Sequence, residues 1–200
     1  MDNLLELGHR IARIGAWFGG GLIIAAAFVV GVEVVIRKAF SVSIGGADEL
    51  SGYALAISTA WALAFALLER AHIRIDSLYV HLPVRLAAVL DVLGLALFTG
   101  FFGLIAWYGL IVVRTSYRLG ARSLSPLGTP LVVPELLWLL GLVTFLLIAG
   151  LLLLRALGAL IAGDLRAVQR LAGSRSVSEE LAAELAELQP PASDPPDRRA

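Results

Sequence analysis

Cysteine is absent from the 200-residue sequence, and charged residues make up only 16% of it. Without cysteine the chain can form no disulfide, no thiolate zinc site, no iron–sulfur cluster and no cysteine nucleophile. Soluble domains usually carry about 25% charged residues. The formal net charge is zero, which gives no bulk basic signal for nucleic acid. These shortages argue against a soluble domain and predict no nucleic-acid partner.

The signature motifs of common catalytic sites are missing as well. The sequence has no Walker A lysine motif, no G-x-S-x-G, no H-E-x-x-H and no nucleotide fingerprint. Its three histidines, His9, His72 and His81, lie outside the long apolar segments described next. A membrane haem protein would normally place facing histidines within its helical bundle. The sequence therefore predicts neither an enzyme nor a bound cofactor or metal.

Hydrophobic residues are abundant instead, at 58% of the chain, with a mean hydropathy of +0.85. They gather in four blocks, at about 14–36, 50–68, 86–113 and 131–154. The first block would form a helix of about 34 Å, enough to cross a hydrocarbon core of about 30 Å. A segment in lipid must satisfy its backbone hydrogen bonds internally, and these blocks are too uniformly apolar for barrel strands. We therefore predict an all-α membrane protein with four transmembrane helices and short loops.

The first block resembles a signal peptide in having Arg10 and Arg13 before it. However, its apolar stretch continues to Ile36, beyond the length of a typical signal-peptide core. We expect an uncleaved signal anchor within a transmembrane domain that comprises residues 1–160.

The distribution of Lys and Arg favours a chain with both termini in the cytoplasm. That orientation places 11 basic residues inside and 5 outside. Three of the five, Arg114, Arg118 and Arg122, share one outer loop, which is unusual. Residues 161–200 would form a cytoplasmic tail, with an amphipathic stretch at 163–172, a helix at 176–188 and a disordered Pro-rich end.

The second predicted loop is the densest polar feature of the chain. It contains the candidate partner contacts Arg70, His72, Arg74 and Asp76, at positions that alternate with apolar residues. One interpretation is a docking element for another protein or for lipid headgroups. The alternative is an ordinary cytoplasmic loop anchored at the membrane surface. Residue types alone leave both open.

Two ionisable residues, Glu33 and Asp91, lie within apolar blocks. Such residues suggest function because an unpaired charge in a membrane is costly. Glu33 is one helical turn from Arg37 and could pair with it. Asp91 could reach Arg85 or interfacial water. We therefore favour structural pairing over a proton relay.

Asp48 and Glu49 precede the second block, where acids suit the N-terminal end of a helix dipole. They could also make a polar contact with a partner on the outer face. Trp61 lies near the middle of the same block, so we expect it to pack against another helix. Gly15 and Gly19 form a G-x-x-x-G pair, a spacing that allows close helix approach.

Several of these segments resemble the DctQ-type small subunit of tripartite ATP-independent periplasmic (TRAP) transporters. Residues 48–53 read DELSGY, against E-E-L-S-x-Y at the start of the family's second helix. Residues 71–76 read AHIRID, against x-H-I-R-V-D at its end. LDVLG at 90–94, WYG at 107–109 and LGTPLVVP at 127–134 resemble later family segments. The resemblance covers about residues 10–155 in order, and it favours the docking interpretation of the second loop.

The sequence departs from the family pattern at several positions. Gly52 stands where Arg is common, and Ile75 stands where Val is usual. Thr129 replaces an isoleucine, and Glu135 follows Pro134 where the family usually has an uncharged residue. The C-terminal tail lies outside the resemblance.

The resemblance implies a small subunit that binds a large multi-helix permease subunit in a bacterial or archaeal cytoplasmic membrane. A soluble periplasmic protein would deliver the substrate. Uptake would be secondary and sodium-driven, typically of carboxylate-bearing organic acids. The sodium and substrate sites would belong to the large subunit, which this chain would brace in the bilayer.

Two other classes of function remain as alternatives at this point. One is a structural or assembly membrane protein of another complex. The other is a membrane enzyme or electron carrier.

Overall fold

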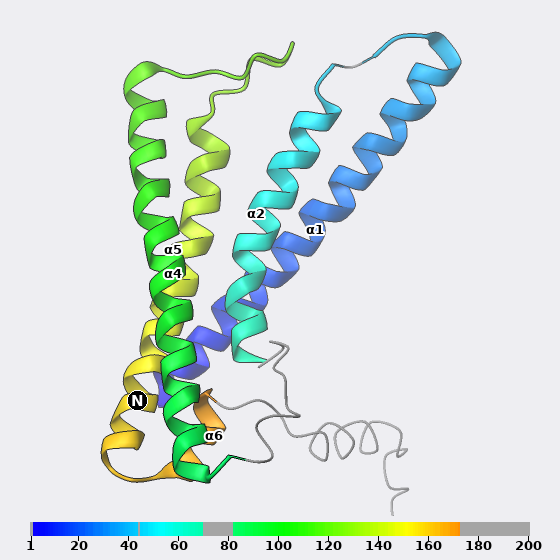
Figure 1. Cartoon of the computed structure of the whole chain (residues 1–200). Coiled ribbons are helices and arrows are strands. Elements are labelled where there is room, and N and C mark those ends of the chain that lie inside the picture. The colour runs from blue at the N-terminus through cyan, green and yellow to red at the C-terminus, as the bar shows by residue number, and fades with distance from the viewer. Residues whose placement is uncertain (1, 44, 70–81, 173–200) are drawn as a thin grey trace, which may run out of the picture.

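The computed structural model describes residues 2–43, 45–69 and 82–172. It is built from helices α1 (Asp2–Phe40), α2 (Ala47–Leu68), α4 (Val84–Leu119), α5 (Val132–Ile161) and α6 (Leu165–Ala172) (Figure 1). The first four are long and apolar enough to cross a membrane. No strand occurs in these three described ranges, where the only β pairing is an isolated bridge. The predicted all-α fold with four transmembrane helices is confirmed.

The ends of the helices follow local backbone chemistry. Pro83 precedes α4 with φ −61°, a value that suits the start of a helix and that the proline ring enforces. Gly120 ends α4 in the left-handed conformation, with φ 59°. The next amide, of Ala121, donates to the carbonyl of Ser116 at 2.9 Å, as in a Schellman-type cap. Apart from Leu131, the apolar blocks lie inside these helices, and α1, α4 and α5 continue for several residues beyond the C-terminal ends of their blocks.

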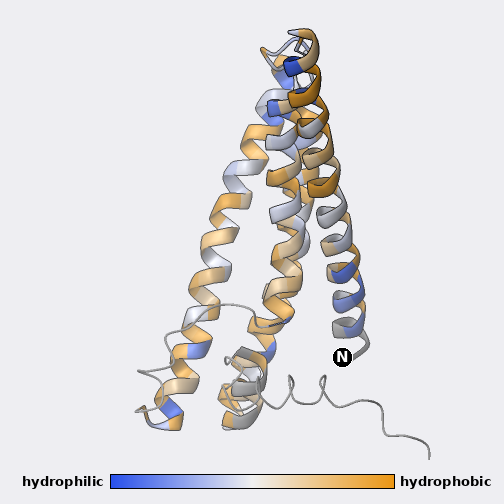
Figure 2. Ribbon diagram, turned by 90° about the vertical axis from the view of Figure 1, so that its right-hand side faces the viewer, coloured by the Kyte–Doolittle hydropathy of each residue, from blue (hydrophilic) through white to orange (hydrophobic). Residues whose placement is uncertain are grey.

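The four long helices form two hairpins, α1–α2 and α4–α5 (Figure 1). Helix α2 packs against α1 on one side and against α5 on the other, and α5 also packs against α4. The N-terminus and α6 lie at one end of the molecule, here called the terminal end (Figure 1). The connections at 41–46 and 120–131 lie at the opposite end, here called the loop end. Hydrophobic residues cover the helices between these ends (Figure 2).

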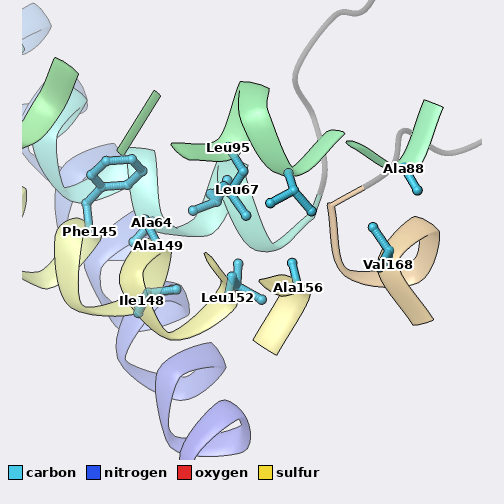
Figure 3. Close-up of a cluster of buried hydrophobic side chains, with 12 residues drawn as sticks. Ala64, Leu67, Ala88, Leu95, Phe145, Ile148, Ala149, Leu152, Ala156 and Val168 are labelled. Atoms are coloured by element: carbon cyan, nitrogen blue, oxygen red, sulfur yellow. The ribbon is translucent and has the colours of Figure 1, made fainter. Parts of the chain in front are cut away.

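The largest buried cluster joins all five described helices towards the terminal end. Phe145 of α5 is fully buried and makes edge-on contacts with Phe98 and Phe102 of α4, with ring centroids 5.6 and 5.0 Å apart. Helix α6 folds back so that the buried Val168 lies beside Ala88 of α4 (Figure 3). Residues 165–172 of the expected amphipathic stretch at 163–172 thus form a helix in contact with α4 and α5.

Small residues bring α1 and α2 together. A Cβ atom added at Gly15 would lie 2.9 Å from Cε3 of Trp61, and one added at Gly19 would lie 3.1 Å from Cα of Ser58. The hydroxyl of Ser58 also donates to the carbonyl oxygen of Gly19 at 2.8 Å. The G-x-x-x-G pair therefore lies in a close helix contact of the kind that small residues permit in membranes.

Candidate functional site

The two connections at the loop end touch each other. Leu127, in the 120–131 loop, packs so closely on Gly46 that a Cβ atom there would overlap its side chain. Its neighbour Pro126 lies against Gly45, whose φ of 74° favours glycine. The absence of side chains at residues 45 and 46 therefore lets the loop of one hairpin rest on the turn of the other.

Glu33 and Arg37 form an ion pair beside this contact. Arg37 Nη2 donates to Glu33 Oε1 at 2.7 Å, and Ser43 Oγ donates to the same oxygen at 2.6 Å. Glu33 is only 2% exposed, whereas the side chain of Arg37 is 58% exposed. The pair follows the i,i+4 spacing, as predicted, and Ser43 connects it to the turn between α1 and α2.

Glu49 joins the two hairpins. Its Oε1 accepts a hydrogen bond of 2.7 Å from the hydroxyl of Tyr53, one turn further along α2. Its Oε2 accepts another, also of 2.7 Å, from the hydroxyl of Ser123 in the 120–131 loop. Ser123 is fixed in turn, because its amide donates to the carbonyl of Thr129 at 2.9 Å. Glu49 therefore does more than complement the dipole of α2.

These groups surround a cavity of about 360 Å³ at the loop end. Its walls include Glu33, Arg37, Asp48, Glu49 and Ser125. Three carboxylates and one guanidinium give it a polar lining, which suits contacts with polar side chains of another protein. Across the described part of the chain, no group of three or more His, Cys, Asp or Glu residues is arranged to hold a metal ion.

The structure thus brings together three of the residues selected from the sequence, namely Glu33, Asp48 and Glu49. It places Asp91 elsewhere, on α4 towards the terminal end, where it is 2% exposed among the helices. A pair between Asp91 and Arg85 stays a prediction.

Trp61 lies at the crossing of three helices, about three turns along α2 from Glu49. Its indole Nε1 donates to the carbonyl oxygen of Leu137 in α5 at 3.0 Å. Its ring meets Phe18 of α1 edge-on, with centroids 5.7 Å apart. A Cβ atom added at Gly141 of α5 would lie 2.9 Å from the same indole. Trp61 thus has the packing environment expected from its place in the helix.

The candidate contacts in the second loop, Arg70, His72, Arg74 and Asp76, lie outside the described residues. Their docking role stays a prediction from the sequence.

Sequence reasoning missed the serines and the tyrosine that complete the cluster. Ser43 and Ser123 are loop residues whose acceptors lie 10 and 74 positions away, and no local pattern indicates such partners. Tyr53 was visible only as part of the DELSGY motif, where its spacing from Glu49 could have indicated the hydrogen bond.

Comparison with known proteins identifies the family. The model of the tripartite ATP-independent periplasmic transporters, DctQ component, matches residues 26–159. That range includes most of the four membrane-spanning helices and both connections at the loop end. No curated protein and no solved structure matches the chain. Because the family model covers well over half of its length, the chain belongs to the DctQ component family of tripartite ATP-independent periplasmic transporters.

Proposed function

We propose that this chain is the small membrane subunit of a TRAP transporter and that it braces a large permease subunit in the cytoplasmic membrane. A soluble periplasmic protein captures the solute and delivers it to this membrane pair. Transport is secondary and driven by sodium, and the solute is an organic acid, most simply one with a carboxylate. The observation that carries the proposal is the family match over residues 26–159.

The surface of the bundle supports a bracing role. Gly100 and Gly103 of α4 have no other side chain or neighbouring helix within 4 Å of a Cβ atom added to them. They lie beside the exposed side chains of Leu97, Phe101 and Leu104. Glycines among large apolar residues make a shallow groove into which a helix of another subunit can pack closely. We therefore assign this face of α4 to the large subunit.

The loop end supports a contact with the periplasmic protein. In the proposed orientation its polar cavity faces the periplasm, where Asp48 is exposed and Arg37 is half exposed. Charged groups at the edge of a transient interface steer association and set specificity. The second loop would lie on the cytoplasmic side, where Arg74 and Asp76 could contact the large subunit.

Co-purification tests the proposal directly. The tagged chain is expressed with the large membrane protein encoded beside it, and the two are extracted together in mild detergent. We expect one stable complex with one copy of each protein, and sodium-dependent uptake when the periplasmic protein is added to proteoliposomes. If the chain elutes alone while both proteins are monodisperse, it belongs to another assembly, and the structural alternative replaces this proposal.

Glycine replacements identify the contact face. Gly100→Leu and Gly103→Leu should leave the isolated chain folded, because both sites are open and Leu favours a helix over Gly by about 1 kcal/mol. They should nevertheless release the large subunit during size-exclusion chromatography. Gly20→Leu on α1 is the matched control, since that site is also open. If both α4 variants retain the large subunit, the interface lies on another face of the bundle.

A further inference from the structure

Glu135, in the first turn of α5, has one carboxylate oxygen without a partner. Its Oε1 accepts a hydrogen bond of 2.9 Å from the hydroxyl of Ser116 in α4. Its Oε2 is buried and makes no hydrogen bond within the described structure. A buried polar atom left unpaired is costly, and native structures contain few of them. No residue in the described ranges completes this site.

A cavity of about 220 Å³ lies beside this carboxylate, between α2 and α5. Ala56 and Ile57 of α2 form one wall, and Tyr53 and Trp138 supply aromatic rings. Among the described residues that line it, Glu135 is the only carboxylate, so the lining is apolar with a single acidic group. Its apolar lining distinguishes it from the polar cavity at the loop end. Tyr53 connects the two cavities, because it lines this one and donates a hydrogen bond to Glu49, which lines the other.

This combination suits one kind of occupant. The aliphatic stem of an Arg or Lys side chain packs well on apolar walls while its charged head seeks a polar group. Aromatic rings attract cations at their faces, and a cation bound to a carboxylate makes a strong hydrogen bond. A neutral apolar side chain would fill the space but would leave Oε2 unpaired.

The basic residues of this chain do not supply the cation within the described ranges. Arg37 is bound to Glu33, and Arg122 donates to the carbonyl of Gly128 at 3.2 Å. Arg114 and Arg118 are exposed on α4, and no ion pair joins either of them to Glu135. The described part of the chain thus leaves the cavity open to a cation from another protein.

We propose that an Arg or Lys side chain of the large membrane subunit enters this cavity and pairs with Glu135 Oε2. The inference rests on the proposed function, because it takes the large subunit as the partner. It goes further by assigning a specific contact to a residue at which the sequence departs from the family pattern. A charge pair placed in an apolar cavity also makes partner choice selective, because a partner without the cation would leave Glu135 unpaired.

The test uses the complex of the full chain with its large subunit, with the dissociation constant measured in detergent by a fluorescent label. Glu135→Gln keeps the shape and the bond to Ser116 but removes the charge. We expect it to weaken the complex at least tenfold, and Glu135→Lys to weaken it further. Glu6→Gln removes an exposed carboxylate at the terminal end and should change nothing. Wild-type affinity in both Glu135 variants would overturn the inference.

A second variant guards against misfolding. Ala56→Lys adds an ammonium group at the edge of the cavity and leaves Glu135 in place, so it competes with the partner's side chain. We expect it to raise the unfolding temperature of the isolated chain and to weaken the complex tenfold or more. Unchanged affinity would contradict the inference.

A charge exchange then identifies the partner residue. Single Arg→Glu and Lys→Glu replacements throughout the large subunit are combined with Glu135→Lys, and one of them should restore the complex. If none does, the occupant is not a basic residue of that subunit. Failure of the unaltered proteins to form any complex would instead contradict the proposed function itself, so the two failures are distinguishable.

Discussion

At the residue scale, the buried Glu33 shows how an acidic side chain is accommodated in an apolar helix. It shares one oxygen between Arg37 and Ser43, so its charge is compensated within 10 positions of the chain. Burying a carboxylate in a low-dielectric region is tolerable only with such partners. This arrangement argues for a structural role, since a carboxylate that carries ions must exchange partners.

The first prediction separates structure from ion transport at this position. Glu33→Ala removes the acceptor for two donors and should lower the free energy of unfolding by about 2 kcal/mol. Glu33→Gln keeps an oxygen acceptor and should cost about 1 kcal/mol or less, because the exposed Arg37 is screened by solvent. Thermal unfolding in detergent measures both.

Uptake assays on the same variants complete the test. Glu33→Gln should retain sodium-dependent uptake in proteoliposomes that contain the complete transporter. Loss of uptake at a normal protein level would assign Glu33 a direct role in ion movement.

At the element scale, the crossing of α2 and α5 depends on the absence of a side chain at Gly141. A Cβ atom there would lie 3.0 Å from the backbone of Ala60 and 2.9 Å from the indole of Trp61. The helices would have to separate by a few tenths of an ångström, which would lengthen the hydrogen bond between Trp61 and Leu137. We therefore expect this crossing to tolerate a Cβ atom at residue 141 poorly.

A matched pair of substitutions tests that view. Gly141→Ala should destabilise the isolated chain by about 1 to 3 kcal/mol through overpacking. Gly100→Ala has open space around it and should stabilise the helix by about 0.5 to 1 kcal/mol. Unfolding temperatures in the same detergent compare them, and equal shifts in the two proteins would contradict a tight contact between α2 and α5 at residue 141.

The elements were largely predictable from the sequence because a bilayer imposes a simple rule. Long apolar runs must become helices, so hydropathy alone predicted four helices that are long enough to span a membrane. The packing of α6 on α4 was not predictable, because no local sequence feature of Val168 indicates a contact with Ala88, 80 positions earlier in the chain. The same limit applies to Glu49 and Ser123, which are 74 positions apart.

At the scale of the whole molecule, an even number of spans places the N-terminus and α6 at the same end (Figure 1). The basic residues favour the cytoplasm for this end. The cavity at the loop end and the 120–131 loop would then face the periplasm.

Cysteine labelling tests this topology cleanly, because the natural chain has no cysteine. Leu124→Cys places a thiol on the exposed 120–131 loop, and Ala162→Cys places one on the exposed turn before α6. A membrane-impermeant maleimide should label the first variant in intact spheroplasts and the second only after the membrane is opened. The reverse result would invert the orientation and move the polar cavity to the cytoplasm.

Glu33 and Glu49 differ in how far along the chain their hydrogen-bond partners lie, and this difference has a consequence for biogenesis. Glu33 and Arg37 leave the ribosome almost together, so this ion pair is complete when α1 enters the membrane. Glu49 meets Tyr53 equally early, but Ser123 follows it by 74 residues. At about 5 to 20 residues per second, the interval is roughly 4 to 15 seconds. During that time Glu49 Oε2 has no Ser123 hydroxyl to bind, so water must hydrate it. The turn of the first hairpin must therefore remain exposed to water until the second hairpin is synthesised.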